Sequence, residues 1–99
     1  MKHISILVPE GDSSLSNLEA TFKMFNMTNS ALQRAGKAPM FATHLVGAQK
    51  TARLSNGMFN IIPNTTIEDI KKTDLIIIPA IHGDYKEVVT KNSALIPWI

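Results

Sequence analysis

Two short polar segments hold the residues that could support chemistry in this sequence. Each follows an apolar run: one comes after residues 4–8 and the other after residues 75–79. The candidate ligand-binding residues are Glu10, Gly11, Asp12, Ile81, His82, Gly83 and Asp84. A carboxylate from Glu10 or Asp84 could orient or deprotonate a bound group beside the His82 imidazole. The sequence therefore predicts a ligand-binding crevice that combines carboxylates with a histidine.

The same side chains have an alternative, structural interpretation. Asp12 and Asp84 are of the type that caps helix amino termini, because a carboxylate accepts hydrogen bonds from free backbone N–H groups. His82 would then lie on a solvated loop, and Glu10 in an exposed turn. The sequence alone leaves both interpretations open.

Several kinds of reactive centre are missing from these residues. The chain contains no cysteine, which removes a cysteine nucleophile, a disulfide framework and a zinc ribbon. No two histidines have metal-ligand spacing, and the glycines are isolated, so no phosphate-binding loop is present. The serines near residue 14 start a helix and are not surrounded by a G-x-S-x-G elbow. We therefore predict no catalytic residue, no metal site and no cofactor.

The two apolar runs are predicted to be neighbouring strands of a parallel sheet. Residues 4–8 and 75–79 are almost continuously apolar and rich in β-branched side chains, which is typical of strands that are buried on both faces. We expect the second run to lie centrally, beside the first. Because ligands of open α/β sheets bind outside the carboxyl ends of the strands, the two polar segments should meet at that edge.

A long helix is predicted over residues 14–35. Its apolar side chains recur with helical spacing at Leu15, Leu18, Phe22, Phe25 and Leu32. Ser16 and Glu19 have the spacing of a capping box, and Gly36 can adopt the left-handed conformation that stops a helix. A strand over residues 40–46 follows.

The middle of the chain contains a predicted hairpin and a predicted short helix. Residues 51–62 comprise two extended pieces around Ser55-Asn56-Gly57, and Asn-Gly is a strong signal for a tight hairpin turn. Thr65 and Glu68 form a second capping-box pattern. This pattern predicts a short helix that ends at Lys71-Lys72, whose charges suit a helix carboxyl end.

The end of the sequence is predicted to form two more short helices. Residues 85–89 indicate the first, and Asn92-Ser93 would cap the second over residues 94–99. The sequence finishes on large apolar side chains, which natural domains seldom expose. Three explanations are open: a fragment of a longer chain, burial in the core, and burial of Trp98 and Ile99 against a second copy. We favour a fragment.

Length, charge and element order define the class of protein. Ninety-nine residues suffice for one hydrophobic core. The formal net charge is +2 and the basic residues are scattered, which does not resemble a nucleic-acid footprint. No apolar stretch approaches a membrane span or forms a signal peptide. We predict a cytoplasmic α/β domain without a membrane partner, with a flavodoxin-like, open, mainly parallel sheet and a β-hairpin, incomplete at its carboxyl end.

Four short motifs occur in a distinctive order along the chain. They are Val8-Pro9-Glu10-Gly11, Lys23-Met24-Phe25-Asn26-Met27-Thr28-Asn29, Ser55-Asn56-Gly57 with Ile62-Pro63, and Asp74-Leu75-Ile76-Ile77-Ile78-Pro79. Their order and spacing closely resemble the first half of the PfpI and ThiJ superfamily, which has the class I glutamine amidotransferase-like fold. The F-N-x-x-N helix and the asparagine-containing ending look most like the amino-terminal domain of AraC-family transcription regulators. The likeness covers nearly the whole chain.

The resemblance implies a truncated regulatory domain that is not an enzyme. Residues 1–99 would be one domain that senses a small-molecule effector and forms a homodimer. DNA would be bound only through a carboxyl-terminal helix-turn-helix domain that is absent from this chain. The alternative is a fragment of a PfpI/ThiJ-type cysteine-dependent hydrolase or hydratase that lacks its nucleophile elbow.

The sequence departs from the enzymatic relatives at two places. Those relatives carry Gly-Gly after the proline of the central strand, where this chain has Ala80-Ile81, so an oxyanion hole is not expected. Glu10 precedes the usual position of the family's acid, and Glu19 is explained by its capping box. Neither glutamate is carried over as catalytic, and the resemblance favours a sensor over an enzyme.

Overall fold

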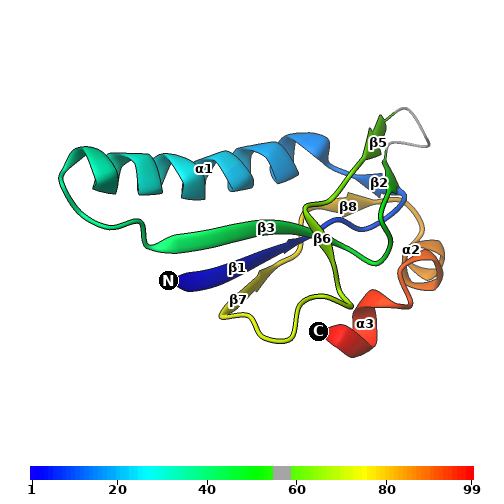
Figure 1. Ribbon diagram of the computed structural model, residues 1–99. Helices are drawn as coiled ribbons and strands as arrows, with labels where there is room; N and C mark the ends of the chain where they lie inside the picture. The colour runs from blue at the N-terminus through cyan, green and yellow to red at the C-terminus, as the bar shows by residue number, and fades with distance from the viewer. Residues whose placement is uncertain (55–58) are drawn as a thin grey trace.

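A four-stranded parallel sheet forms the centre of the molecule. The computed structural model describes residues 1–54 and 59–99. The sheet contains β1 (Lys2–Leu7), β3 (Phe41–Gly47), β6 (Thr65–Thr66) and β7 (Leu75–Ile77). Its strand order is β6-β3-β1-β7, and each neighbouring pair is parallel (Figure 1). This arrangement confirms the predicted α/β class with a flavodoxin-like, open and mainly parallel sheet.

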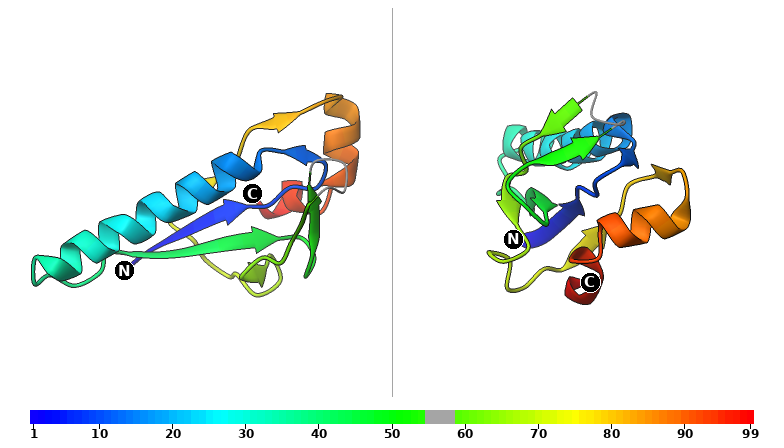
Figure 2. Two further views of the ribbon diagram at one scale, coloured as in Figure 1. Left: turned by 90° about the horizontal axis from the view of Figure 1, so that it is seen from above. Right: turned by 90° about the vertical axis from the view of Figure 1, so that its right-hand side faces the viewer.

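Strand β1 is buried on both faces, as its apolar run predicts. Ile6 contributes to a cluster between the sheet and α1 (Leu15–Arg34), whereas Leu7 contributes to a second cluster on the opposite face. Figure 2 shows α1 along one face of the sheet and α3 (Leu95–Trp98) on the other. The continuous apolar sequence is explained by this double coverage, because residues 4–7 of β1 are buried on both faces.

The long helix lies close to its predicted bounds, but a different serine caps it. The Ser14 hydroxyl accepts a hydrogen bond from the Asn17 N–H (3.2 Å). The predicted capping box is wrong, since Glu19 instead pairs with Lys23 one turn later (2.8 Å). Gly36 ends the helix as predicted, with a φ of +77° that favours glycine.

The second asparagine of the F-N-x-x-N motif joins α1 to β3. The Asn29 Oδ1 atom accepts hydrogen bonds from the N–H groups of Met40 and Phe41 (both 3.0 Å), and its Nδ2 atom donates to the Phe41 carbonyl (2.7 Å). The Phe25 and Phe41 rings meet edge to face, with centroids 5.0 Å apart. This motif therefore has a structural role here.

The predicted hairpin is confirmed in its two strands. β4 (Ala52–Leu54) and β5 (Phe59–Ile61) pair in antiparallel fashion, with Ala52 opposite Ile61. Ala52 and Leu54 are buried in the cluster beneath α1. The predicted Ser55-Asn56-Gly57 turn lies outside the described residues.

The helix predicted over residues 65–72 is wrong. β6 (Thr65–Thr66) is extended and pairs with β3, and the Ile67 N–H then donates to the Gly47 carbonyl (2.9 Å). The free edge of β3 offers hydrogen-bond partners to this backbone. Pairing with that edge is therefore favoured over the helix that the local capping box would start. The following Ile67 and Ile70 pack against the second apolar cluster.

The strand predicted over residues 75–79 is shorter than expected and occupies an edge. β7 pairs with β1, as predicted, but no strand of the described residues lies on its other side. Leu75 is 46% exposed and Ile78 is 52% exposed. The prediction of a central position is therefore wrong, because an apolar composition reports a preference for burial and not the number of neighbouring strands.

The last segment forms α2 (Tyr85–Lys91) and the single turn α3. Asn92 does not cap α3 as predicted, because α3 has no side-chain cap. Trp98 packs against the second cluster, and its Nε1 atom donates to the Ile70 carbonyl (3.4 Å), while Ile99 stays largely exposed. Within the described residues, no helix is long and apolar enough to cross a membrane.

Candidate functional site

The two polar segments singled out by the sequence meet at the carboxyl edge of the sheet. β2 (Asp12–Ser13) and β8 (Ile81–His82) form a short antiparallel pair, in which Asp12 lies opposite His82 and Ser13 opposite Ile81. The Ser14 N–H extends this ladder by donating to the Ala80 carbonyl (3.0 Å). Segments separated by about seventy residues are thus joined through backbone hydrogen bonds.

This edge is the topological switch point of the sheet. The chain moves outward from β1 through β3 to β6, and then returns to β7 on the other side of β1. In folds of this kind, ligands bind beside the carboxyl ends of the strands that flank such a point. The predicted site residues follow these two strands.

A small cavity of ≈ 190 Å³ lies in this crevice. Four of the predicted residues line it, and three further residues from α2 complete it: Gly11, His82, Gly83, Asp84, Glu87, Val88 and Lys91. The cavity is smaller than the roughly 300–1,000 Å³ of pockets for drug-sized ligands. A ligand held here would have to be small or to extend into solvent.

Glu10 lies outside that cavity. Its N–H donates to Asn92 Oδ1 (2.7 Å), and its carbonyl accepts from Asn92 Nδ2 (3.0 Å). The same Nδ2 atom donates to the Val88 carbonyl (2.9 Å), so buried Asn92 ties the end of β1 to α2. Glu10 and Asn92 line a second cavity of ≈ 160 Å³. The predicted crevice is therefore divided into two small cavities.

Lys91 borders both of these cavities. Lys91 and Asn92 carry no sequence signal for a binding site, since Lys91 ends a short helix and Asn92 is of a type that caps helices. A basic residue in the last turn of a helix is ordinarily explained by the helix dipole. Only the hydrogen bonds between Asn92 and Glu10, which attach the end of α2 to the segment after β1, bring Lys91 to the crevice.

The structural interpretation of Asp84 is correct. Its Oδ1 atom accepts a hydrogen bond from the Lys86 N–H (2.8 Å) and caps α2. His82 is exposed, as that interpretation expects, but it lies in the short strand β8 and not in a loop. The cap of the long helix is Ser14. The crevice can thus offer an imidazole, an ammonium group and carboxylates to a polar ligand, while no pair of them is arranged as a nucleophile and its base.

The Ala80 N–H, which follows β7, is not free to bind an oxyanion. The Ala80 N–H donates to Asn17 Oδ1 (3.2 Å), and Ile81 and His82 lie in the ladder with β2. An oxyanion hole needs backbone N–H groups that point into open space. The occupied Ala80 N–H agrees with the sequence departure at Ala80-Ile81.

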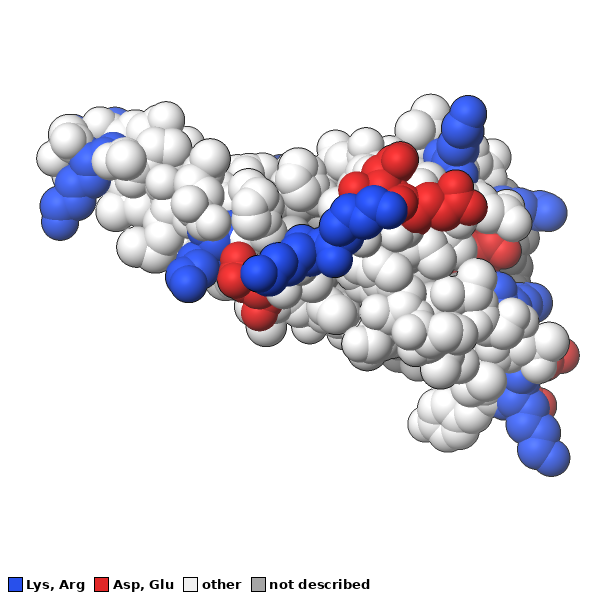
Figure 3. Space-filling model, turned by 60° about the horizontal axis from the view of Figure 1, so that its bottom comes forward, with Lys and Arg blue, Asp and Glu red and all other residues white. Residues whose placement is uncertain are grey.

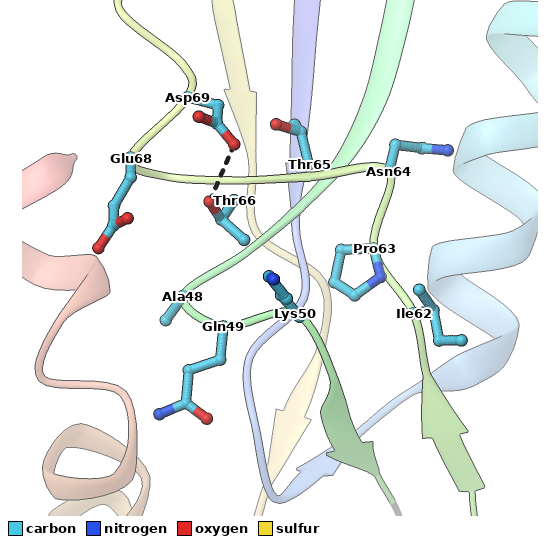
Figure 4. Close-up of a pocket in the computed structure, with 10 residues that line it drawn as sticks. All are labelled: Ala48, Gln49, Lys50, Ile62, Pro63, Asn64, Thr65, Thr66, Glu68 and Asp69. Atoms are coloured by element: carbon cyan, nitrogen blue, oxygen red, sulfur yellow. Dashed lines mark hydrogen bonds between the residues drawn. The ribbon is translucent and has the colours of Figure 1, made fainter.

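A third and larger cavity, of ≈ 590 Å³, lies beyond the carboxyl end of β3. Figure 4 shows it between residues 48–50 and residues 62–69, with Thr66 and Asp69 joined by a hydrogen bond of 3.4 Å. It shares Ala48 and Gln49 with the cavity beside Glu10. The sequence does not predict this hollow, because its capping-box pattern indicates a helix over residues 65–72.

Charged side chains of both signs are interleaved on the surface. Figure 3 shows a short row of basic side chains that is flanked at both ends by acidic ones. Among the residues that the structure describes, no group of three or more histidines and carboxylates could hold a metal ion.

Comparison with known proteins supports the fold. No protein-family model matches the sequence, and no curated protein matches it significantly. One similar solved structure is that of a candidate transcriptional regulator protein from Vibrio parahaemolyticus, with a TM-score of 0.72 and 17% identical residues. The match covers 98% of this chain and 48% of that chain, so this chain spans about half the length of its neighbour.

Proposed function

We propose that this chain is the effector-sensing and dimerisation domain of an AraC-type transcription regulator, and that it is not itself an enzyme. The observation that carries the proposal is the crevice at the switch point of the sheet, where His82, Asp84 and Lys91 surround a small cavity. The described fold is shared with a protein from Vibrio parahaemolyticus that is described as a candidate transcriptional regulator. A ligand crevice in a regulator-like fold supports sensing.

The proposed effector is a small polar molecule that carries both signs of charge. Lys91 can pair with an anionic group, and Glu87, one turn earlier on α2, with a cationic group in the same cavity of ≈ 190 Å³. The adjoining cavity beside Glu10 would receive an extension of the same ligand. A free amino acid is the simplest molecule with this chemistry.

DNA binding is proposed to reside in another part of the regulator. The interleaved charges give this domain no continuous basic patch on the face in Figure 3. The open edge at β7, where Leu75 and Ile78 are exposed, supports the view that residues 1–99 are one truncated domain to which further chain adds. The helix-turn-helix domain would follow it.

Two observations support a sensor in preference to a cysteine-dependent hydrolase. The 99 residues contain no cysteine. The Ala80 N–H is occupied by Asn17, so it does not point at a reacting carbonyl. A cysteine elbow that another part of the protein places beside this crevice would weaken both observations.

The sensing proposal can be tested by titrating the chain with free amino acids and following backbone amide resonances. Shifts confined to Gly11, Gly83 and α2, and their loss in the Lys91→Gln variant, are the expected result. Acetate and methylammonium serve as probes with a single charge. Lys86→Gln, on the same helix but outside the cavity lining, is the matched control. An absence of saturable shifts with every amino acid would count against sensing at this crevice.

A further inference from the structure

A second apolar stripe runs along the side of α1 that faces away from the sheet. Its members occur at spacings of four, three and four residues: Ala20, Met24, Met27 and Ala31. Met24 is 55% exposed and Met27 is 68% exposed. Because the inward stripe already includes Leu18, Phe22 and Phe25, the outer stripe adds nothing to the core of this chain.

The spacing of the outer stripe is that of a seam between two helices. Apolar side chains that alternate at three and four residues stay aligned along one line, which a neighbouring helix can cover. Methionine fills irregular space at such contacts, and alanine lets two backbones approach each other. Exposed methionines at the middle of the stripe therefore indicate an absent partner.

We propose that this outer stripe is the contact surface between two copies of the chain, whose α1 helices pack antiparallel about a two-fold axis. The stripe has the same residue types and spacing in both directions, alanine, methionine, methionine, alanine. In the antiparallel register, Met24 lies opposite the partner's Met27, and Ala20 opposite the partner's Ala31. A two-fold contact requires such self-complementarity.

The charges beside the stripe fit the same register. Glu19 and Arg34 lie on the same flank of α1, near opposite ends of the stripe. Antiparallel packing brings Glu19 within about two residues, or roughly 3 Å along the axis, of the partner's Arg34. Lys23 faces the partner's Asn26 and the partner's Ser30, which are uncharged. No like charges therefore meet, and a parallel register would lose both Glu19–Arg34 pairs.

The contact is small. A stripe one helix wide buries less than the roughly 1,200 Å² that is typical of stable dimers. We therefore expect reversible dimerisation with a dissociation constant in the micromolar range. The use of this surface in regulation rests on the proposed function, whereas its existence does not.

Sedimentation velocity over about a hundredfold range of chain concentration tests the surface. The wild type is expected to shift from monomer to dimer, and Met27→Glu to weaken dimerisation by about tenfold or more. Gln33→Glu adds the same charge to an exposed position of α1 that belongs neither to the stripe nor to the flanking pairs, and it serves as the control. A wild type that stays monomeric, or a Met27→Glu variant that dimerises like the wild type, would overturn the proposal.

Cysteine cross-linking tests the register and does not depend on the charged variant. The chain has no native cysteine, so single cysteines report single contacts. A mixture of the Met24→Cys and Met27→Cys variants is expected to form more disulfide-linked dimer than either variant alone. Preferential linking of each variant to itself would indicate a parallel arrangement and would contradict the proposal.

The outcomes separate this surface from the proposed function. Met27→Glu should leave the amide shifts caused by amino acids at Gly83 unchanged, because α1 presents its outer side away from the crevice. Amino-acid binding without dimerisation would remove only the surface proposed here. Dimerisation without any amino-acid binding would remove only the sensing role.

Discussion

The amino-terminal half of this domain and its last part, residues 75–99 (the second half below), are stabilised in different ways. In the amino-terminal half, β1 is covered on both faces, and Ile6 is fully buried beneath α1. In residues 75–99, β7 is an edge strand with exposed apolar side chains, and α2 contains no buried residue. The second half is attached through short ladders and Asn92. We infer that the first half supplies most of the stability, whereas the second can adjust around a ligand.

Replacing one isoleucine in each part should give the largest difference in the free energy of unfolding. Ile6→Ala removes a fully buried side chain and should lower the free energy of unfolding by about 3 kcal/mol. Ile78→Ala, at a position that is 52% exposed, should cost less than about 1 kcal/mol. Urea unfolding followed by circular dichroism measures both. Equal losses would mean that the two halves are equally well packed.

Asn92→Ala is the next test, because two hydrogen bonds of Asn92 join α2 to Glu10 and a third holds its side chain to the Val88 carbonyl. Leaving the Glu10 backbone groups without partners should cost about 2 kcal/mol. Amide hydrogen exchange should accelerate in α2 more than in α1. Ser93→Ala, at an exposed neighbour, is the control and should change neither quantity. Uniform acceleration throughout the chain would show that α2 is not an independently mobile unit.

Asn29→Ala should have a somewhat smaller effect, within the first half. It removes the hydrogen bonds from α1 to Met40 and Phe41 at a half-buried site, at an expected cost of about 1.5 kcal/mol. Asn26→Ala, the exposed asparagine of the same motif, should be neutral. Thermal unfolding of the two variants measures the difference. Equal losses at the two asparagines would show that the motif stabilises the helix itself and not its attachment to β3.

The smallest effect concerns Asp74, at the start of β7. Its carboxylate accepts a hydrogen bond from the His3 N–H (2.7 Å), and this bond holds its pKa below the ordinary value of 3.8. Because the folded pKa is depressed, the stabilisation is present above that ordinary value. It is lost as the pH falls through the folded pKa. Unfolding midpoints between neutral and acidic pH should thus fall more in the wild type than in Asp74→Asn. Parallel pH profiles would show that this hydrogen bond adds no pH-dependent stability.

Local patterns in the sequence predicted much of the fold. The long helix follows from the periodicity of its apolar side chains, and its end from Gly36. The pairing of β1 with β7 follows from two continuous apolar runs. These signals are reliable because each reflects a property of neighbouring residues. The helix predicted over residues 65–72 was wrong, because a capping box is a local pattern and carries no information about the free edge of β3.

The candidate site was predicted in part. The sequence placed the two polar loops at one edge of the sheet, and the β2–β8 pair brings them together. It did not separate Glu10 from His82, which line different cavities. It also missed Lys91, since a basic side chain at a helix end has a common local explanation. The ligand-binding role of these residues remains a prediction.

The sequence by itself determined the α/β class, the long helix and the two loops that supply the site, because periodicity and turn chemistry act over a few residues. The tertiary structure alone decided that β7 occupies an edge, that Asn92 divides the crevice and that Lys91 borders both of its parts. These features depend on which distant segments pack together. Packing of that kind is set by the whole chain, so the carboxyl edge acquires its chemistry only when the domain folds.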